Sequence, residues 1–346
     1  MDNEIIEQLF MSLANATKEQ GIGLFSEHHK GISVDVSLEN FHELGFPTSE
    51  MLARKVCFID GGNLEIFSAP NFSVQLIRLY YTIYANNKRI HSERSEFFCL
   101  VKSAIKNGKL YFETEAFGKS PVGKLSFYSY DQELRSGVSR IQASAIGNNV
   151  RKLCEIRIIE ECAMHLDRGD FVIMDGELSE KTMTEHNFFE SAYRLCDEKG
   201  IIISALAKTN TLLTDSGDSL TSLIFSSCPD GEWAYYPLVK EDSSKYSLKR
   251  CMVKLNLRSN HSFKLEIRSF VDQMLILAQL LKANSVDPVF LGYPYGLIEA
   301  DRFARVTKEE LEYLRTKLLA GSERGFKTMS RYFHLMDAHD ILDNIG

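Results

Sequence analysis

Two short apolar segments of this chain each end in the dipeptide Asp-Gly, and this repeated strand ending constrains the fold more than any other feature. The first segment is VCFID before Gly61, and the second is FVIMD before Gly176. Asp175 ends a buried strand whose apolar neighbours cannot screen a charge, so its carboxylate needs a cation or a basic partner. Because ligands bind open α/β sheets at the carboxyl ends of strands, Asp60 and Asp175 can converge on one site. The first copy also fits a tight turn between strands, which is the commonest use of Asp-Gly.

The hydrophobic patterns predict antiparallel strands first and alternating helices and strands afterwards, which indicates an α/β fold with a mixed sheet. A β-meander is expected over 55–85, followed by a helix-compatible piece at 95–107 and a segment at 109–116. A helix at 149–167, a strand at 171–176, a helix at 186–199 and a strand at 201–208 make a strand–helix–strand unit. The remaining expected elements are an amphipathic helix at 3–18, strand-like patches at 220–227, 233–239 and 263–270, a helix at 271–284, and a helix opened by a capping box of Thr307 and Glu310 that runs to about 319.

Composition excludes several classes of protein. The 346 residues carry 40 Lys and Arg against 47 Asp and Glu, a net charge of −7, which is not the balance of a protein that coats nucleic acid by charge alone. The seven cysteines include no CxxC pair, which disfavours a disulfide framework and a Cys-rich zinc site. The start of the chain has no signal-peptide pattern, and no stretch is apolar enough to cross a membrane, so a cytoplasmic protein is expected.

A third carboxylate joins the two strand-end aspartates. In the helix expected at 149–167, the helical period places Glu155 on the apolar side, toward the sheet. The alternative is a glutamate in the first helical turn that the helix dipole stabilises. Asp60, Glu155 and Asp175 would form an all-oxygen cluster suited to Mg²⁺ or Mn²⁺ rather than to zinc. Carboxylates around two such ions are a recurring arrangement for phosphodiester hydrolysis.

The most distinctive segment is GYPYGLIEADRFARV at 292–306, in which Gly-Tyr-Pro-Tyr-Gly enters a helix that carries Glu299, Asp301 and Arg302. Asp301 follows Tyr293 by eight residues. With this segment the sequence resembles the NurA nucleases, a family of prokaryotic enzymes that process DNA ends. The other motifs match in order: the Asp60-Gly61 strand, Glu155 on a helix before the Asp175-Gly176 strand, and a strand that closes in Lys208. The resemblance covers about 55–306.

The resemblance implies an RNase H-like fold, a metal site of Asp60, Glu155, Asp175 and Asp301, and Tyr293 close to the substrate. Some members of the family have His where this chain has Asp301. The implied activity is 5′–3′ exonuclease and single-strand endonuclease action on DNA in end resection and repair, with two Mn²⁺ or Mg²⁺ ions. The implied partners are a second copy of the chain, in a homodimer, and a HerA-type hexameric translocase. The domain expected at 51–320 would lie between an N-terminal helical extension at 1–50 and a C-terminal helical tail at 321–346.

Two basic residues are candidates for contact with DNA. Lys208 ends a strand from which it could reach the scissile phosphate, although a solvated lysine at a strand end is an equally good interpretation. Arg268 in LEIRSF offers a second DNA contact, with a salt bridge as its alternative role.

Two other hypotheses remain open. In an actin-like ATPase, Asp-Gly-Gly loops grip phosphates and Mg²⁺, and FIDGGN is compatible with such a loop, although the expected glycine-rich adenosine site is not evident in the sequence. In a catalytically inactive adaptor for a DNA motor, the fold persists without the reaction. Clustered carboxylates argue against the adaptor, because buried charge without a metal is costly.

Overall fold

The computed structural model describes residues 24–26, 29–32, 36–135, 137–209, 212–214, 219–238 and 248–320. The chain divides into two compact units. One consists of Lys55–Met174, Ser179–Ile201 and Gly296–Gly346 and is called here the meander unit. The other consists of Met1–Arg54, Asp175–Leu178 and Ile202–Tyr295. The helices predicted at 3–18 and over 321–346 lie outside the described residues, and the predicted domain bounds stay a prediction.

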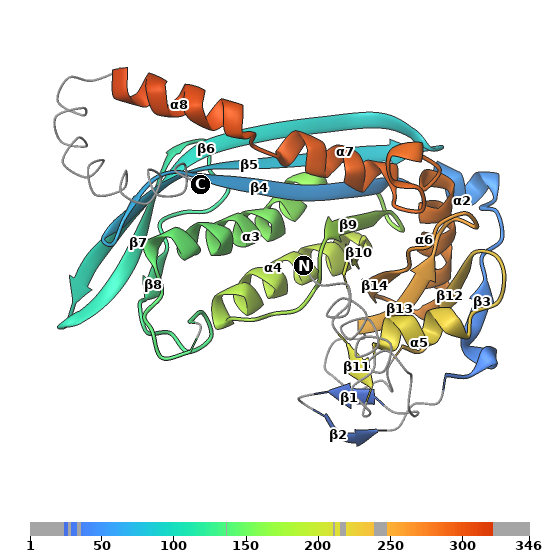
Figure 1. Ribbon diagram of the computed structural model, residues 1–346. Helices are drawn as coiled ribbons and strands as arrows, with labels where there is room; N and C mark the ends of the chain where they lie inside the picture. Colours follow the sequence, from blue (N-terminus) through green and yellow to red (C-terminus); the bar gives the residue numbers. More distant parts are fainter. Residues whose placement is uncertain are drawn as a thin grey trace, which may run out of the picture. The chain divides into compact units, whose positions relative to one another are not determined.

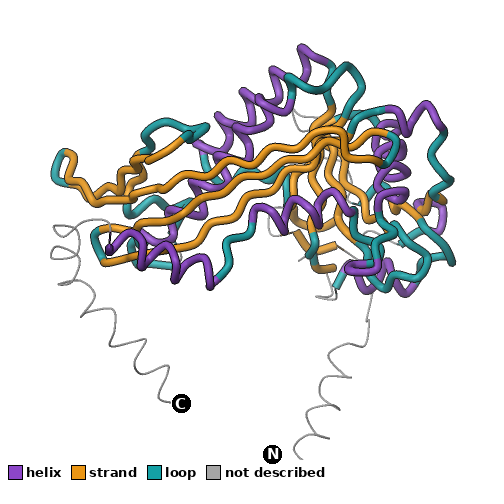
Figure 2. The backbone as a smooth tube through the Cα atoms, turned by 90° about the horizontal axis from the view of Figure 1, so that it is seen from above, coloured by secondary structure: helices purple, strands orange, loops and turns teal. Residues whose placement is uncertain are grey.

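The meander unit is built on long antiparallel strands, of which β4 also has a parallel neighbour. Tight turns join them: Asn86 and Asn87 have φ of 51° and 55°, and Asn107 and Gly108 have φ of 49° and 72°, the left-handed conformation of two-residue hairpin loops. Figure 2 shows these strands running side by side. In the order β9-β4-β5-β6-β7-β8 they are β9 (Phe171–Asp175), β4 (Val56–Ala69), β5 (Phe72–Ala85), β6 (Lys88–Lys106), β7 (Lys109–Gly118) and β8 (Ser126–Tyr128).

This arrangement confirms the predicted meander and the mixed sheet, and it corrects one element. The piece at 95–107 that looked compatible with a helix belongs to β6, where it pairs with β5 on one side and β7 on the other. Every second side chain of this part of β6 is buried, as alternation along a strand predicts. The buried residues are Phe97, Cys99 and Val101. Pairing with neighbouring strands decides between helix and strand here, and a local pattern does not contain that information.

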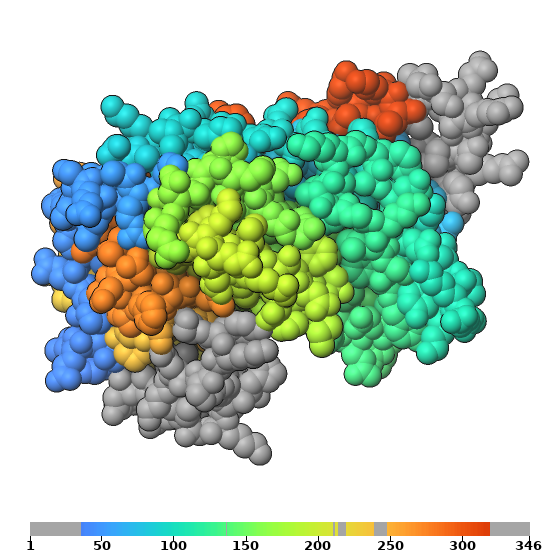
Figure 3. All heavy atoms as spheres, turned by 180° about the vertical axis from the view of Figure 1, so that it is seen from behind, coloured from blue at the N-terminus to red at the C-terminus, as the bar shows by residue number. Residues whose placement is uncertain are grey.

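Helices cover both faces of the meander (Figure 1). Helix α3 packs against β4 and β5 on one face, with α4 beside it, and α7 and α8 lie along the other face. On the side seen in Figure 3, the segment that follows β7 and helix α4 make up much of the surface of this unit. The four helices are α3 (Ala143–Cys162), α4 (Met183–Lys199), α7 (Tyr295–Ala304) and α8 (Lys308–Ala320).

The helix ends follow ordinary capping chemistry. Helix α4 starts earlier than predicted because the Thr182 hydroxyl accepts a hydrogen bond from the Glu185 amide, and it ends at Gly200 in the left-handed conformation. One half of the predicted capping box is present at α8, where the Glu310 amide donates to the Thr307 hydroxyl at 3.2 Å, whereas the Glu310 carboxylate binds Arg78. Helix α3 begins and ends about five residues before the predicted limits.

The second unit contains antiparallel strands in the order β3-β12-β13-β14-β10, and α6 is the longest helix among its described residues. Residues 220–227, expected to be strand-like, instead form α5, whose first turn is capped by the Ser219 hydroxyl. The strands are β3 (Phe41–Glu43), β12 (Trp233–Tyr235), β13 (Leu248–Lys254), β14 (Phe263–Arg268) and β10 (Ile202–Ala207), with a small sheet of β1 (Leu24–Ser26), β2 (His29–Ile32) and β11 (Leu213–Thr214). The helices are η1 (Leu38–Asn40), α2 (Ser49–Ala53), α5 (Leu220–Ser226), α6 (Val271–Asn284) and η2 (Pro288–Phe290). Among the described residues, none of the helices has the length and apolar character needed to cross a membrane.

Candidate metal centre

Three of the predicted carboxylates come together. Asp60 lies within β4, Asp175 is the last residue of β9, and Asp301 lies on α7. One carboxylate oxygen from each lies within 4.8 Å of the others, and all three side chains are partly buried. Strand β9 runs parallel to β4, with Ile59 opposite Met174. Asp60 and Asp175 are the next residues along the two strands, and they therefore lie side by side. We call these residues the carboxylate trio.

The donor set of the trio fits a hard divalent cation. Oxygens that bind one ion at about 2.0–2.6 Å each lie at most about 5 Å apart, and the trio meets this limit. Carboxylate oxygens are the preferred ligands of Mg²⁺ and Mn²⁺, whereas zinc sites usually include His or Cys. The trio could therefore hold an ion of the predicted kind.

The two glycines after Asp60 allow close approach on both sides of β4. A Cβ atom at Gly61 would lie 2.5 Å from the Glu155 Oε1 atom, and one at Gly62 would lie 2.2 Å from the Ala304 carbonyl oxygen. Asp60 and Gly61 are in the middle of a continuous strand, so the interpretation of this Asp-Gly as a tight turn is wrong. The glycines serve packing, and they bring α3 and α7 against the strand next to Asp60.

Glu155 points toward the sheet as its helical position predicts, but the trio does not include it. Its side chain is buried and forms an ion pair with Arg151, four residues earlier on α3. The same Arg151 donates a hydrogen bond to the Gly61 carbonyl oxygen at 2.9 Å. Glu155 thus lies beside the backbone that follows Asp60, and its role as a metal ligand stays a prediction.

Lys208 lies next to Asp175, and its predicted contact with the scissile phosphate stays a prediction. Its Nζ atom is 2.6 Å from Asp175 Oδ2 and 5.4 Å from the centroid of the Tyr293 ring. Tyr293 is buried and packs against the rings of Phe263 and Phe290. The structure thus places two of the three predicted DNA-contacting residues together.

The third, Arg268, is the last residue of β14, opposite Leu248 in β13. Its predicted contact with DNA stays a prediction.

Sequence reasoning missed two arginines that pair with the predicted carboxylates. Arg305 forms an ion pair with Asp301 at 2.7 Å, and Arg151 does so with Glu155. Both pairs have the i,i+4 spacing of helical neighbours, so the spacing could have revealed them.

A third missed residue is Glu299 on α7, which is buried and accepts hydrogen bonds from Tyr80 and Tyr84 on β5. Its partners are more than 200 residues away in the sequence, and no local pattern could have identified them.

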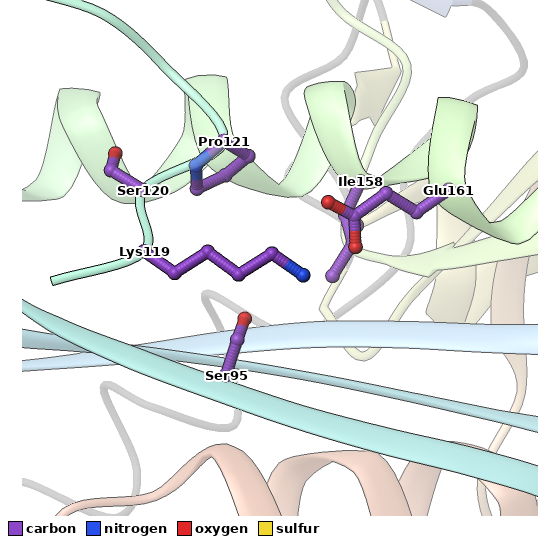
Figure 4. A pocket seen from close by; sticks show the side chains of 6 residues that line it. All are labelled: Ser95, Lys119, Ser120, Pro121, Ile158 and Glu161. Atoms are coloured by element: carbon purple, nitrogen blue, oxygen red, sulfur yellow. The ribbon is translucent and has the colours of Figure 1, made fainter.

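A small pocket lies on the α3 side of the meander unit (Figure 4). Its volume is about 30 Å³, enough for a water molecule but not for a nucleotide. The Lys119 side chain extends across it toward Ile158 and Glu161. The lining residues are Ser95, Lys119, Ser120, Pro121, Ile158 and Glu161, and none of the trio is among them.

Comparison with known proteins shows the fold. The chain is similar to the crystal structure of the NurA nuclease from Sulfolobus solfataricus, with a TM-score of 0.54 and 12% sequence identity over 93% of this chain and 99% of that one. Its likeness to the catalytic domain of human endonuclease V is weaker, with a TM-score of 0.40 and 12% identity over 80% and 92% of the two chains. No model of a protein family matches the sequence, and no curated protein matches it. The predicted RNase H-like fold and the resemblance to NurA are thus confirmed at the level of the fold.

Proposed function

We propose that this chain is a metal-dependent deoxyribonuclease that hydrolyses phosphodiester bonds with an ion held by Asp60, Asp175 and Asp301. One observation carries the proposal: the trio brings together three carboxylates from β4, β9 and α7, on a fold shared with a protein described as the NurA nuclease. Since fold alone does not determine function, the chemistry of the trio is the essential part of this support.

The residues of the chain supply binding and charge for the reaction. When bound, a divalent ion would polarise the phosphodiester and lower the pKa of an attacking water. Lys208, paired with Asp175 and about one third exposed, can offer its ammonium group to a phosphate oxygen as negative charge develops. The Tyr293 ring beneath that ammonium group limits where it can move. Glu155 would support the backbone beside Asp60 or add a further oxygen ligand.

The finer assignment rests on the sequence motifs shared with the NurA family. They support 5′–3′ exonuclease and single-strand endonuclease activity in DNA end processing, two Mn²⁺ or Mg²⁺ ions, a homodimer, and work with a HerA-type hexameric translocase. A cytoplasmic location belongs to the same set of proposals.

The two alternative hypotheses have less support. Residues 60–63 continue as strand β4 and do not form the phosphate-gripping loop that an actin-like ATPase would need. An inactive adaptor would have to hold three carboxylates together with only neighbouring cations, such as Lys208 and Arg305, to offset the repulsion between them.

The decisive experiment measures cleavage of labelled DNA with Mn²⁺, with Mg²⁺ and with EDTA. Linear substrates labelled at the 5′ or 3′ end report polarity, and circular single-stranded DNA reports endonuclease activity. We expect Asp60→Asn, Asp175→Asn and Asp301→Asn each to lower the rate by at least about 100-fold, because each removes a charged ligand. The matched control is Asp230→Asn, which changes an exposed carboxylate of the second unit. Trio variants that cleave like the parent would show that the active site lies elsewhere, and ATP binding without cleavage would favour the ATPase.

A further inference from the structure

Glu299 is a buried carboxylate that the proposed chemistry does not use. It lies on α7 two residues before Asp301, and only 4% of its surface is exposed. The Tyr80 and Tyr84 hydroxyls each donate a hydrogen bond to one of its two oxygens, both at 2.6 Å. Arg89 on β6 adds a third bond at 3.1 Å. A buried carboxylate with this many donors is fixed in direction as well as in place.

The partners of Glu299 come from two neighbouring strands. Tyr80 and Tyr84 on β5 each bind a different oxygen of the carboxylate, and Arg89 on β6 pairs with the Oε1 atom at 3.1 Å. Glu299 thus joins α7 to both strands through hydrogen bonds of defined direction.

Close contacts hold α7 against the meander at both ends of the helix. At the start, a Cβ atom at Gly296 would lie 2.2 Å from the Phe58 ring. At the end, Ala304 meets Gly62, and the Phe303 ring stacks on Tyr80 with centroids 5.0 Å apart. The helix therefore has no room to move closer to the sheet.

These apolar and backbone contacts fix the distance of α7 from the sheet, and the Phe303–Tyr80 stack is the part of them that also resists rotation. The buried residues Gly296, Ala300 and Ala304 have small side chains or none. They therefore interlock little with the sheet and resist rotation or sliding of α7 only weakly. Hydrogen bonds depend on angle, so the bonds to Glu299 restrict both movements. Glu299 and Asp301 are about 200° apart around the helix, and any turn that pulls Glu299 from its partners also displaces Asp301.

We propose that Glu299 is a positioning residue for the metal centre: bound by Tyr80, Tyr84 and Arg89, it sets the rotation of α7 and so places Asp301 within reach of Asp60 and Asp175. This inference rests on the proposed function, because it assigns Asp301 to a metal ion. Glu299 itself does not belong to the trio. Its effect on metal binding passes through the helix.

The test compares Glu299→Gln with Asp301→Asn in Mn²⁺ binding by calorimetry and in DNA cleavage over a range of Mn²⁺ concentrations. Glutamine keeps the shape of Glu299 but removes the charge. Its NH₂ group would replace one acceptor oxygen, so that a hydrogen-bond donor would face the donor of a tyrosine or of Arg89. We expect Mn²⁺ affinity to fall about tenfold, as for residues that orient metal ligands. Excess Mn²⁺ should restore cleavage by Glu299→Gln, which keeps all three ligands, but not by Asp301→Asn.

Two further kinds of variant keep the test decisive. The control is Glu309→Gln, at an exposed position on α8, which should leave Mn²⁺ affinity unchanged. If Glu299→Gln does not fold, Tyr84→Phe and Arg89→Met each remove a single donor and should weaken Mn²⁺ binding in the same direction by a smaller factor. Faster amide hydrogen exchange in α7 of these variants, measured without metal, would give independent support.

The outcomes separate the two proposals. A parent protein that neither binds Mn²⁺ nor cleaves DNA would overturn the proposed function. A parent that does both, with a Glu299→Gln variant whose Mn²⁺ affinity is unchanged, would overturn the positioning role and leave the nuclease proposal intact. A variant that only unfolds at a lower temperature, with unchanged Mn²⁺ affinity while folded, would show that Glu299 is merely structural.

Discussion

The two faces of strand β5 are buried to a similar degree but made of different chemistry. On the face toward α3, the side chains of Ile77, Leu79 and Ile83 are completely buried and apolar. On the face toward α7 and α8, the buried side chains include Arg78 and Tyr80, with Tyr84 further along. Over residues 77–84 one strand thus carries mainly apolar side chains toward α3 and several polar ones toward α7 and α8. Nearer the start of the strand, the α3 face also holds the buried Gln75, which donates to the Ser144 carbonyl oxygen at 2.7 Å.

The polar face depends on specific partners. Arg78 is 4% exposed, and it pairs with Glu96 at 2.8 Å and with Glu310 on α8, while its Nη1 atom donates to the Arg305 carbonyl oxygen at 2.8 Å. These bonds hold the connection between α7 and α8 against the strand. Apolar packing tolerates small shifts, whereas a buried charge costs free energy unless its partners are in place. The difference teaches that the α3 face provides stability and the opposite face provides orientation, on the side that carries Asp301.

The largest effect on stability is expected on the apolar face. Ile77→Ala should lower the free energy of unfolding by about 2–5 kcal/mol, because it leaves a cavity under α3. Urea denaturation measures this change, and the affinity of the remaining folded protein for Mn²⁺ should stay the same. A loss below about 1 kcal/mol, or a large loss of Mn²⁺ affinity, would contradict the division of roles between the faces.

A smaller loss of stability is expected one residue further along the strand. Arg78→Met should cost about 1–3 kcal/mol, because Glu96 and Glu310 are 46% and 35% exposed and can be hydrated when the arginine is removed. Mn²⁺ affinity should fall in this variant, since the connection after α7 loses its anchor. The control is Lys88→Met, which changes an exposed cation on β6. An effect on stability without any effect on Mn²⁺ affinity would show that this face does not orient α7.

The apolar face and the strand-end aspartates were predictable because both depend on local patterns. The strand-like pattern at 78–85 belongs to the predicted meander, and the two Asp-Gly endings place Asp60 and Asp175 on buried strands, which the structure shows to be parallel neighbours. Local patterns failed where tertiary partners decide the structure. Residues 95–107 are a strand because β5 and β7 flank them. The helix Leu220–Ser226 is a different case, because its Ser219 cap is a local signal that the strand interpretation overlooked.

The polar face was not predictable for the same reason. Arg78 and Glu310 are 232 residues apart, and Tyr80 and Glu299 are 219 apart, so no spacing rule connects them. Isolated in the sequence, Glu299 resembles any glutamate of an amphipathic helix. Only the folded chain shows that Glu299 is buried and bonded to Tyr80 and Tyr84, the contacts on which its proposed positioning role rests.

The smallest expected effect is a change in the response to acid. The hydrogen bond from Arg78 lowers the pKa of Glu310 below its ordinary value of 4.5. A carboxyl group whose pKa is lower in the folded state than in the unfolded state contributes stability above pH 4.5, and this contribution is lost as pH falls from there through the folded value. Glu310→Gln should therefore make the loss of stability on acidification shallower, by at most about 1 kcal/mol because Glu310 is one third exposed.

Urea denaturation between pH 7 and about pH 3 measures this slope for the parent, for Glu310→Gln and for the exposed control Glu309→Gln. The parent and the control should lose stability in parallel below pH 4.5. The stability of Glu310→Gln should approach theirs at low pH, because protonation of Glu310 in the parent removes the same charge interaction with Arg78 that the substitution removes. If all three proteins kept a constant separation across this range, the Arg78–Glu310 pair would contribute no charge-dependent stability, and the polar face of β5 would owe its order to shape alone.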